Sequence, residues 1–375
     1  MFRKGILDVL RRLKLYRACF GIPKGEIGFA QLSAIKILKS DEYQPIKRQA
    51  PQTVGEGIYW KFEKALNDSP QQTFVIEARN WRVWGNQGAV ITNKDELFKD
   101  VSREFEKPDH SIFKQFKLVK PQILKGTTAV INASGADMYY HWMCDVLPRI
   151  KLLMDCGLTE EIDYYILDYR DISFQTEALN VLKIDRAKIS RANDHFNYHA
   201  RAERLLVPSL PSKLDVVSAE ACKFLRDTFL NEQAPVKTGR KIYVKRTGKR
   251  KIINDGEIEG YLESQGFESV QCENYSIAEQ AAIFYNADVI VGPHGAAFTN
   301  AVFCRPGTRI IEFFSPRWIN PCYWTICNEV SLKYFYLVGQ GPAPDEFSDA
   351  NGTNADIQLD IGKLKQLFEQ NIILN

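Results

Sequence analysis

A histidine and an aspartate lie four residues apart, at His141 and Asp145, in the segment SGADMYYHWMCDVLPRI. If this segment is helical, residues at that spacing share a face and lie within reach of each other. A carboxylate beside an imidazole orients the ring and raises its basicity, so the pair could serve as a general base. Solvated surface pairs use the same spacing, and the spacing alone leaves both interpretations open.

A basic loop follows a predicted strand in the segment KIYVKRTGKRKIIND. Arg246 ends the strand predicted over 241–246, and Lys249, Arg250 and Lys251 come shortly after it. Arginine can pair with two phosphate oxygens at once, which suits a di- or triphosphate ligand. The alternative interpretation is an ordinary solvated loop.

A glycine-rich turn in DVIVGPHGAAFTN joins a strand to a helix predicted over 296–303. Gly292 and Gly295 permit close approach to the backbone, and a helix N-terminus presents unpaired N–H groups to an anion. His294 could donate to a phosphate or to a sugar hydroxyl. Glycine and proline also end strands without any binding role. Glu312, at the end of the following strand, could accept from ribose hydroxyls or cap a neighbouring group.

Several ligand-binding patterns are absent from the sequence: G-x-G-x-x-G, the G-x-x-x-x-G-K-[ST] phosphate loop, and a metal-chelating D-x-D. An oxidoreductase is therefore not expected. Without a D-x-D, the charge of a phosphate would be met by arginine, lysine and helix N-termini rather than by a metal ion. The eight cysteines include no C-x-x-C pair, which argues against a zinc site and favours a reducing compartment.

The composition is that of a soluble globular protein of 375 residues, with 45% hydrophobic and 25% charged residues. A net charge of +3 and the absence of a nucleic-acid signature argue against a nucleic-acid partner. No apolar run is long enough to span a bilayer. The N-terminal residues 1–25 lack a secretory hydrophobic region and have the pattern of a basic amphipathic helix. Such a helix either packs on the protein surface or attaches to an anionic membrane face.

Two runs of alternating strands and helices predict parallel sheets in two α/β domains. Short antiparallel strands are expected within residues 73–92, before the first run. The first run has strands at 127–133, 163–169 and 204–209, with helices at 138–154, 174–182 and 216–230. The second has strands at 241–246, 267–272, 288–292, 309–314 and 334–338, with helices at 256–265, 277–287 and 296–303, and a final helix at 356–370.

The predicted organisation divides the chain into five parts. An N-terminal basic amphipathic segment (1–50) precedes a first α/β domain (51–230). A polar linker (231–240) leads to a second α/β domain (241–345), and a loop with a helix (346–375) ends the chain. Two doubly wound domains joined in this way predict a cleft between facing strand ends, where such sheets bind ligands.

The sequence resembles glycosyltransferase family 61 in three blocks. In chain order they are HWMCDVLPR, KIYVKRTGKRKIIND and VIVGPHGAAFTNAVFCRPGTRIIE. The resemblance covers roughly residues 75 to 340. It implies a GT-B-like fold with two Rossmann-type domains, and an inverting transferase that uses a nucleotide sugar. The family's motifs fall on the predicted catalytic residues His141 and Asp145. We place the donor-binding residues at Arg246, Arg250, Gly292, His294, Gly295, Ala296, Asn300 and Glu312.

The function expected from this resemblance is transfer of a sugar from a nucleotide-diphosphate donor, a UDP-sugar by preference, to a glycan or lipid-linked glycan hydroxyl. The donor would bind the second domain and the acceptor the first. Asp145, directly or through His141, would take the acceptor proton, with no metal or cofactor. The alternatives are a non-catalytic glycan- or nucleotide-binding scaffold and a sugar-nucleotide epimerase.

Plant and animal relatives carry an anchor or a signal, and this chain shows neither. That difference favours a bacterial enzyme of capsule, exopolysaccharide or lipopolysaccharide synthesis. The expected location is the cytoplasm, with attachment to the inner face of the membrane.

Overall fold

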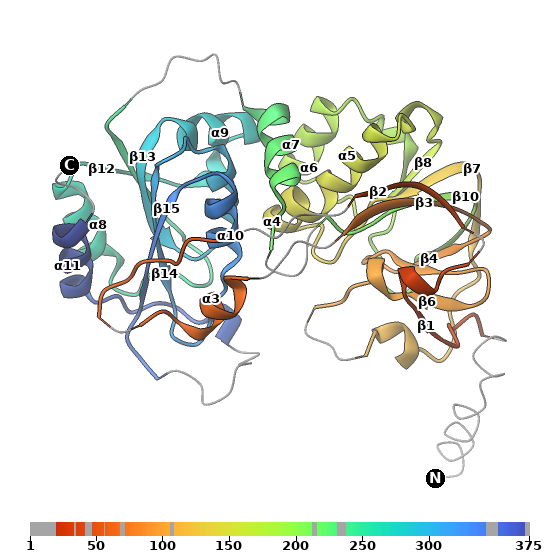
Figure 1. Ribbon diagram of the computed structural model, residues 1–375, viewed down its shortest axis with the longest axis horizontal. Coiled ribbons are helices and arrows are strands. Elements are labelled where there is room, and N and C mark those ends of the chain that lie inside the picture. The colour runs from red at the N-terminus through yellow and green to blue at the C-terminus, as the bar shows by residue number, and fades with distance from the viewer. Residues whose placement is uncertain are drawn as a thin grey trace, which may run out of the picture. The chain divides into compact units, whose positions relative to one another are not determined.

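The computed structural model describes residues 20–33, 35–41, 47–55, 57–67, 72–105, 109–211, 216–230, 238–342 and 352–371. They form two compact units, each described here by itself (Figure 1). Unit 1 contains the described residues of 20–41 and 72–211, and unit 2 those of 47–67 and 216–371. Most of the predicted N-terminal amphipathic helix and most of the predicted linker lie outside the described residues.

The units divide the chain differently from the predicted domains. The chain passes into unit 2 after Pro211, so helix α7 (Ala219–Phe229) belongs to unit 2. The physical reason is the apolar stripe of α7, which packs against helices of unit 2. Residues 47–67, assigned from the sequence mostly to the first domain, also belong to unit 2 and include α3 (Trp60–Ala65).

Unit 2 contains a five-stranded sheet in which all strands are parallel, in the order β12-β11-β13-β14-β15. The strands are short apolar runs, as expected when both faces of a sheet are covered. The parallel sheet predicted for the second domain is confirmed. Its strands are β11 (Arg240–Val244), β12 (Phe267–Val270), β13 (Ala287–Pro293), β14 (Arg309–Phe314) and β15 (Lys333–Val338).

This strand order creates a topological switch point between β11 and β13. The chain leaves β11 toward β12 on one side and returns to β13 on the other, so the loops after β11 and β13 diverge. Ligands of doubly wound sheets bind in the crevice outside the carboxyl ends at such a point. The sequence blocks around Arg246 and His294 follow these two strands.

Helices cover both faces of the unit 2 sheet (Figure 1). Helices α8 and α11 share one apolar core with residues of the sheet, and α9 and α10 lie on the other face. Their bounds are α8 (Asp255–Ser264), α9 (Ile277–Tyr285), α10 (Cys322–Glu329) and α11 (Ile361–Asn371). The predicted helix at 296–303 is a 3-10 helix, η8 (Ala296–Phe303), and η7 (Cys272–Asn274) and η9 (Gly352–Asn354) are further 3-10 turns.

Unit 1 contains a mixed ten-stranded sheet, which corrects the expectation of a purely Rossmann-type first domain. Strands β10, β7, β8 and β9 are parallel neighbours, but β3 and β4 pair antiparallel with β10, and β5 with β4. The ten residues of β10 are long enough to pair with β3 at one end and β4 at the other. The short strands predicted within residues 73–92 are confirmed as β3, β4 and β5.

The strands of unit 1 are β1 (Gly25–Ile27), β2 (Lys36–Asp41), β3 (Thr73–Arg79), β4 (Arg82–Trp84), β5 (Ala89–Ile91), β6 (Glu96–Phe98), β7 (Gln122–Val130), β8 (Tyr164–Leu167), β9 (Ile189–Arg191) and β10 (His199–Pro208). Its 3-10 turns are η1 (Phe29–Gln31), η2 (Lys99–Val101), η3 (Ser111–Lys114), η5 (Thr159–Glu161) and η6 (Arg186–Lys188).

The helix predicted over 138–154 is interrupted. It consists of α4 (Tyr139–His141), a π-helical turn η4 (Trp142–Val146) and α5 (Leu147–Asp155). Pro148 lies at the start of α5 and has no amide N–H, so the regular α-helical ladder cannot run through it. Helix α6 (Ser173–Val181) follows β8 as predicted. Single π turns inside helices occur often at functional sites.

The described cysteines are all free thiols. Within the part of the chain that the structure describes, no helix combines the length and the apolar character needed to cross a bilayer.

Candidate active site

The predicted pair of His141 and Asp145 is in direct contact in unit 1. His141 Nδ1 lies 2.7 Å from Asp145 Oδ2, at the junction of α4 and the π-helical turn. The Asp145 side chain is 3% exposed, whereas that of His141 is 17% exposed. Solvent or a substrate can therefore reach the imidazole but not the carboxylate.

Asp145 also faces two arginines. Arg103 Nη2 lies 3.2 Å from Asp145 Oδ1, which is the oxygen that His141 does not use. The fully buried Arg149 donates to the carbonyl oxygens of Asn132 and Pro208. Burial lowers the pKa of Arg149 to about 9, and the nearby Asp145 carboxylate opposes that shift. Both oxygens of Asp145 are engaged, so the accessible proton acceptor of the pair is His141 Nε2, to which no described residue is bonded.

A short loop after η2 brings two side chains to this pair. Arg103 reaches Asp145, and the Phe105 ring centroid lies 4.6 Å from that of His141. Glu104, between them, is buried and accepts from the Ser111 backbone N–H at 2.7 Å, which holds the loop in place. Sequence reasoning missed all three residues, because no motif or spacing connects them with His141.

Gly135 makes room for the His141 ring. Its φ of +74° lies in the left-handed region that favours glycine. A Cβ at this position would lie 2.7 Å from His141 Cδ2 and 2.5 Å from Met138 Cε. A side chain here would push the imidazole from its position against Asp145.

In unit 2 the predicted donor-site residues gather at the carboxyl ends of β11 and β13. A Cβ on Gly292 would lie 2.6 Å from the Val244 carbonyl oxygen of β11, and a Cβ on Gly295 would overlap Arg246 Nη1. These glycines do permit close approach, as the sequence suggests. The groups that approach them are the protein's own strand and arginine.

His294 and Glu312 form a second histidine–carboxylate pair, and both are buried. Glu312 Oε1 contacts His294 Nδ1, and Glu312 Oε2 accepts from the Tyr334 hydroxyl. Burial raises the pKa of Glu312 to about 8. Burial, with the charges of Arg250, Arg246 and Lys61, lowers the pKa of His294 well below its ordinary value. Both Glu312 oxygens are occupied, so the geometry favours its predicted role of capping a neighbour over binding a ribose.

Three cations approach this pair. Burial and the neighbouring charge of Arg250 lower the pKa of Arg246. Arg250 has a φ of +61°, and its buried Nε has no hydrogen-bond partner among the described residues. Lys61 Nζ lies 5.2 and 5.6 Å from the ring centroids of Trp318 and Trp60. An unpartnered buried donor among converging positive charges is what an anion site requires.

Lys61 was not predicted, because it comes from the N-terminal part of the chain. Helix α3 carries it to unit 2, where Phe62 packs edge-on against Phe314 and Trp324. Phe314 in turn lies 5.1 Å, ring to ring, from His294. Apolar packing of α3 therefore delivers a cation to the switch point.

The remaining predicted donor residues lie on η8. Ala296 is its first residue and is half-buried, next to Gly295. Asn300 is fully buried and donates to Gln280 Oε1 of α9 at 2.7 Å, which fastens η8 to that helix. Contact of either residue with a donor stays a prediction.

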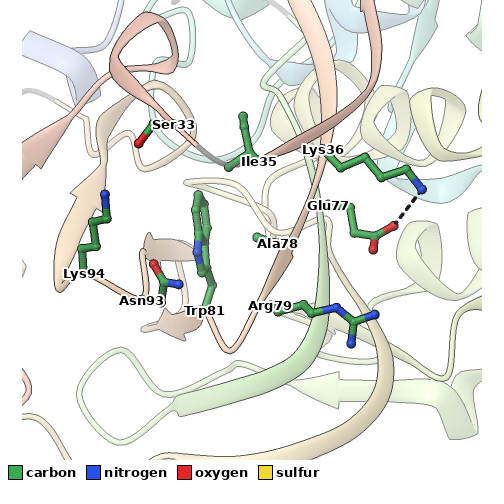
Figure 2. Close-up of a pocket in the computed structure, with 9 residues that line it drawn as sticks. All are labelled: Ser33, Ile35, Lys36, Glu77, Ala78, Arg79, Trp81, Asn93 and Lys94. Carbon is green, nitrogen blue, oxygen red and sulfur yellow. Dashed lines mark ion pairs between the residues drawn. The ribbon is translucent and has the colours of Figure 1, made fainter.

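No group of three histidine, cysteine or carboxylate side chains is placed to hold a metal ion among the residues that the structure describes. Unit 1 has a hollow of about 300 Å³, and Trp81, Lys36 and Glu77 are among the residues that line it (Figure 2). Lys36 and Glu77 form an ion pair at 3.7 Å. None of the predicted site residues lines it. It is distinct from both clusters described above.

These features define an α/β protein with a cluster of cations at a doubly wound switch point and a separate histidine–aspartate pair. Residues 139–311 match the family model described as Glycosyltransferase 61. This match confirms the resemblance to glycosyltransferase family 61 found in the sequence, and that family implies glycosyltransferase activity. No curated protein matches the chain.

Proposed function

We propose that the protein is an inverting, metal-independent glycosyltransferase that uses a nucleotide-diphosphate sugar, with a UDP-sugar as the first candidate. The donor binds unit 2, and the acceptor, a hydroxyl of a glycan or lipid-linked glycan, binds unit 1. The observation that carries the proposal is the group of Arg246, Arg250 and Lys61 around the neutral His294 at the switch point. A diphosphate is the ligand class that this charge pattern fits.

Arg250 supplies the most specific support for a phosphate ligand. Its Nε is buried without a partner in the described protein, and a donor in that state is costly unless a ligand satisfies it. Arginine and lysine can together stabilise the charge that develops on a departing diphosphate, without a metal ion. The sequence contains no metal-chelating D-x-D, which agrees with charge stabilisation by arginine and lysine.

His141 is the proposed general base, and Asp145 is the residue that orients it. This assignment refines the sequence expectation, in which Asp145 was the preferred base. Arg103 and His141 occupy the two oxygens of Asp145, whereas no described residue bonds to Nε2 of the partly exposed His141. A carboxylate that accepts from Nδ1–H holds the ring in the tautomer whose Nε2 can accept a proton.

The proposed reaction is a single displacement. The acceptor hydroxyl loses its proton to His141 Nε2 as its oxygen attacks the anomeric carbon of the donor. The bond from that carbon to the diphosphate oxygen breaks, and the nucleoside diphosphate leaves with the electron pair. One displacement at the anomeric carbon inverts its configuration.

Binding and turnover of the donor test this proposal. A nucleoside diphosphate at about 100 times its dissociation constant should stabilise the protein by about 2.7 kcal/mol, which a thermal shift can read. The matching nucleotide sugar should then transfer to a glycan with inversion, and excess EDTA should leave the rate nearly unchanged. Restoration of an EDTA-inhibited rate by Mn²⁺ would refute metal independence.

The same assay distinguishes the alternative functions. Conversion of the donor sugar without any acceptor would indicate an epimerase, and binding without turnover would indicate a scaffold. We place the reaction in bacterial capsule, exopolysaccharide or lipopolysaccharide synthesis, at the cytoplasmic face of the membrane. This placement depends on the family resemblance, and the acceptor found in the transfer assay decides it.

A further inference from the structure

A basic and apolar segment of unit 1, residues 112–125, has no part in either site. Its sequence, IFKQFKLVKPQILK, contains four lysines and no aspartate or glutamate, which gives it a formal charge of +4. It runs from η3 into the first half of β7. We call the exposed side chains of this segment the lysine-rich face.

Buried residues fix the segment to the unit. Ile112, Leu118 and Leu124 are all buried, and Ile112 and Leu118 share a core cluster with Trp84. His199 Nδ1 lies 2.6 Å from the Val119 carbonyl oxygen, within hydrogen-bond distance. The segment is therefore an anchored part of the fold, and its outward side chains are presented from a defined backbone.

The outward side chains combine large apolar groups with cations. Phe116, Val119 and Ile123 are 52%, 37% and 60% exposed. The four lysines alternate with them and are all exposed: Lys114, Lys117, Lys120 and Lys125. No described carboxylate forms an ion pair with any of these lysines. Exposed aromatic and aliphatic groups framed by unpaired lysines are unusual on a surface that faces only water.

Neighbouring elements extend the lysine-rich face. Arg201 of β10 is exposed and is the parallel partner of Ile123 in the sheet, so the two side chains lie side by side. Phe20 stacks at a tilt on Phe116, with ring centroids 5.5 Å apart, and its carbonyl oxygen accepts from Leu118 N–H at 2.9 Å. Phe20 is also where residues 1–19, which the sequence predicts to be basic and amphipathic, join the described chain.

From these observations we infer that the lysine-rich face docks on an anionic lipid surface, with Phe116, Val119 and Ile123 entering the headgroup region and the lysines contacting the lipid phosphates. Charge complementarity selects this partner, because the segment carries no acidic group that an ordinary protein partner would pair with. Apolar side chains flanked by lysines match the membrane–water interface, where the apolar groups meet the acyl boundary and the lysines meet charged headgroups. The inference does not depend on the proposed reaction.

Vesicle cosedimentation of the full chain tests this surface. We expect binding to phosphatidylcholine vesicles in which about one third of the lipid is phosphatidylglycerol, weakening as salt rises, and little binding to pure phosphatidylcholine. The double variant Lys117→Glu and Lys120→Glu should weaken binding at least about 25-fold, since each lysine near an anionic leaflet contributes about fivefold. Phe116→Ser should weaken it about tenfold.

Control variants lie elsewhere on unit 1. Met154→Ser on α5 removes a comparably exposed apolar side chain, and Lys183→Glu after α6 reverses an exposed lysine. Helices α5 and α6 lie at the other end of this unit from β1 and β6 (Figure 1). Both controls should bind vesicles like the natural protein, and all variants should keep its melting temperature, because the changed side chains are on the surface.

Three outcomes would overturn the inference. The first is unchanged vesicle binding in both lysine-rich-face variants. This outcome also overturns the inference if deletion of residues 1–19 abolishes binding, because the membrane contact would then lie in that segment alone. The second is equal binding to neutral vesicles. The third is self-association that Phe116→Ser abolishes while vesicle binding persists, which would make this face an interface between copies of the chain.

Discussion

Unit 1 contains the pair of His141 and Asp145 and unit 2 the pair of His294 and Glu312, and the two pairs differ in almost every respect beyond their contact. In unit 1, His141 is partly exposed and Asp145 is held by Arg103. In unit 2, His294 and Glu312 are both buried, and the second carboxylate oxygen accepts from Tyr334. Because both pairs contain a histidine, the difference in their chemistry must come from the groups around each ring.

The groups around each pair decide whether the carboxyl group or the imidazole holds the proton between them. Asp145 is paired with Arg103 and accepts from His141 Nδ1–H, which leaves Nε2 of that ring as the proton acceptor. Burial raises the pKa of Glu312 to about 8, and burial with three nearby cations lowers that of His294. Glu312 therefore keeps the shared proton at neutral pH and His294 presents Nε2–H as a donor. One ring is suited to take a proton, and the other to donate a hydrogen bond to an anion.

The largest expected effect follows from removing the proposed base. His141→Ala should lower turnover by about 10² to 10⁴, the usual contribution of positioned base catalysis, while affinity for the nucleoside diphosphate stays unchanged. Initial rates and calorimetric binding on the same preparation measure both quantities. Full turnover in this variant would remove His141 as the base, and a parallel loss of nucleotide affinity would indicate damage to the fold.

A matched pair of glycine variants tests whether the position of His141 matters. Gly135 and Gly157 have similar positive φ values, 74° and 68°, but only Gly135 has His141 beside it. Alanine at either position should cost about 1 to 2 kcal/mol of stability. Only Gly135→Ala should also slow turnover, by up to about 10² if the ring shifts by about an ångström. Equal rates in the two variants would mean that this imidazole needs no fixed position.

Removing a cation of unit 2 should weaken nucleoside diphosphate binding, which the loss of His141 should leave unchanged. Arg250→Ala and Arg246→Ala should each weaken nucleoside diphosphate binding by about 10- to 100-fold, because a hydrogen bond to a charged group contributes about 1.5 to 3 kcal/mol. Lys249→Ala, which changes an exposed lysine of the same loop, serves as the control. Unchanged affinity in both arginine variants would reassign the loop to the solvated surface.

The smallest expected effect is a pH dependence of stability. Between the ordinary pKa of 4.5 and its folded pKa of about 8, Glu312 binds more protons in the folded state, so stability falls as pH rises. His294 has the opposite sign below its ordinary pKa of 6.5 and offsets this there. From pH 6.5 to 8 Glu312 is the member of this pair that titrates, and it should lower the free energy of unfolding by about 1.4 kcal/mol per pH unit.

Glu312→Gln isolates this contribution, because glutamine can keep the contacts of Glu312 but does not titrate. Urea unfolding of both proteins at pH 6.5 and pH 8 should show a steeper loss in the natural protein. Parallel pH profiles would show that Glu312 is ionised throughout, which would remove the distinction drawn between the two pairs.

Local pattern predicted the features that depend on neighbours in sequence. The spacing of His141 and Asp145 placed them in contact, since one helical turn brings them together even with a π-helical turn between. The alternation of apolar runs and helices predicted the parallel sheet of unit 2 and put Arg246 and His294 at strand ends, and the strand order of the structure makes those two strands neighbours. The sequence did not predict the π-helical turn before Pro148, since it indicated one continuous helix over 138–154.

Tertiary packing decided everything that joins distant parts of the chain. No local signal placed Arg103 beside Asp145, or carried Lys61 on α3 to His294. The mixed sheet of unit 1 depends on β10 pairing with strands formed far earlier in the chain. Hydrophobic periodicity reports which face of an element is buried, but the partner of that face is chosen by packing among all elements. That choice set the charge around each histidine, and with it which ring takes a proton and which donates one.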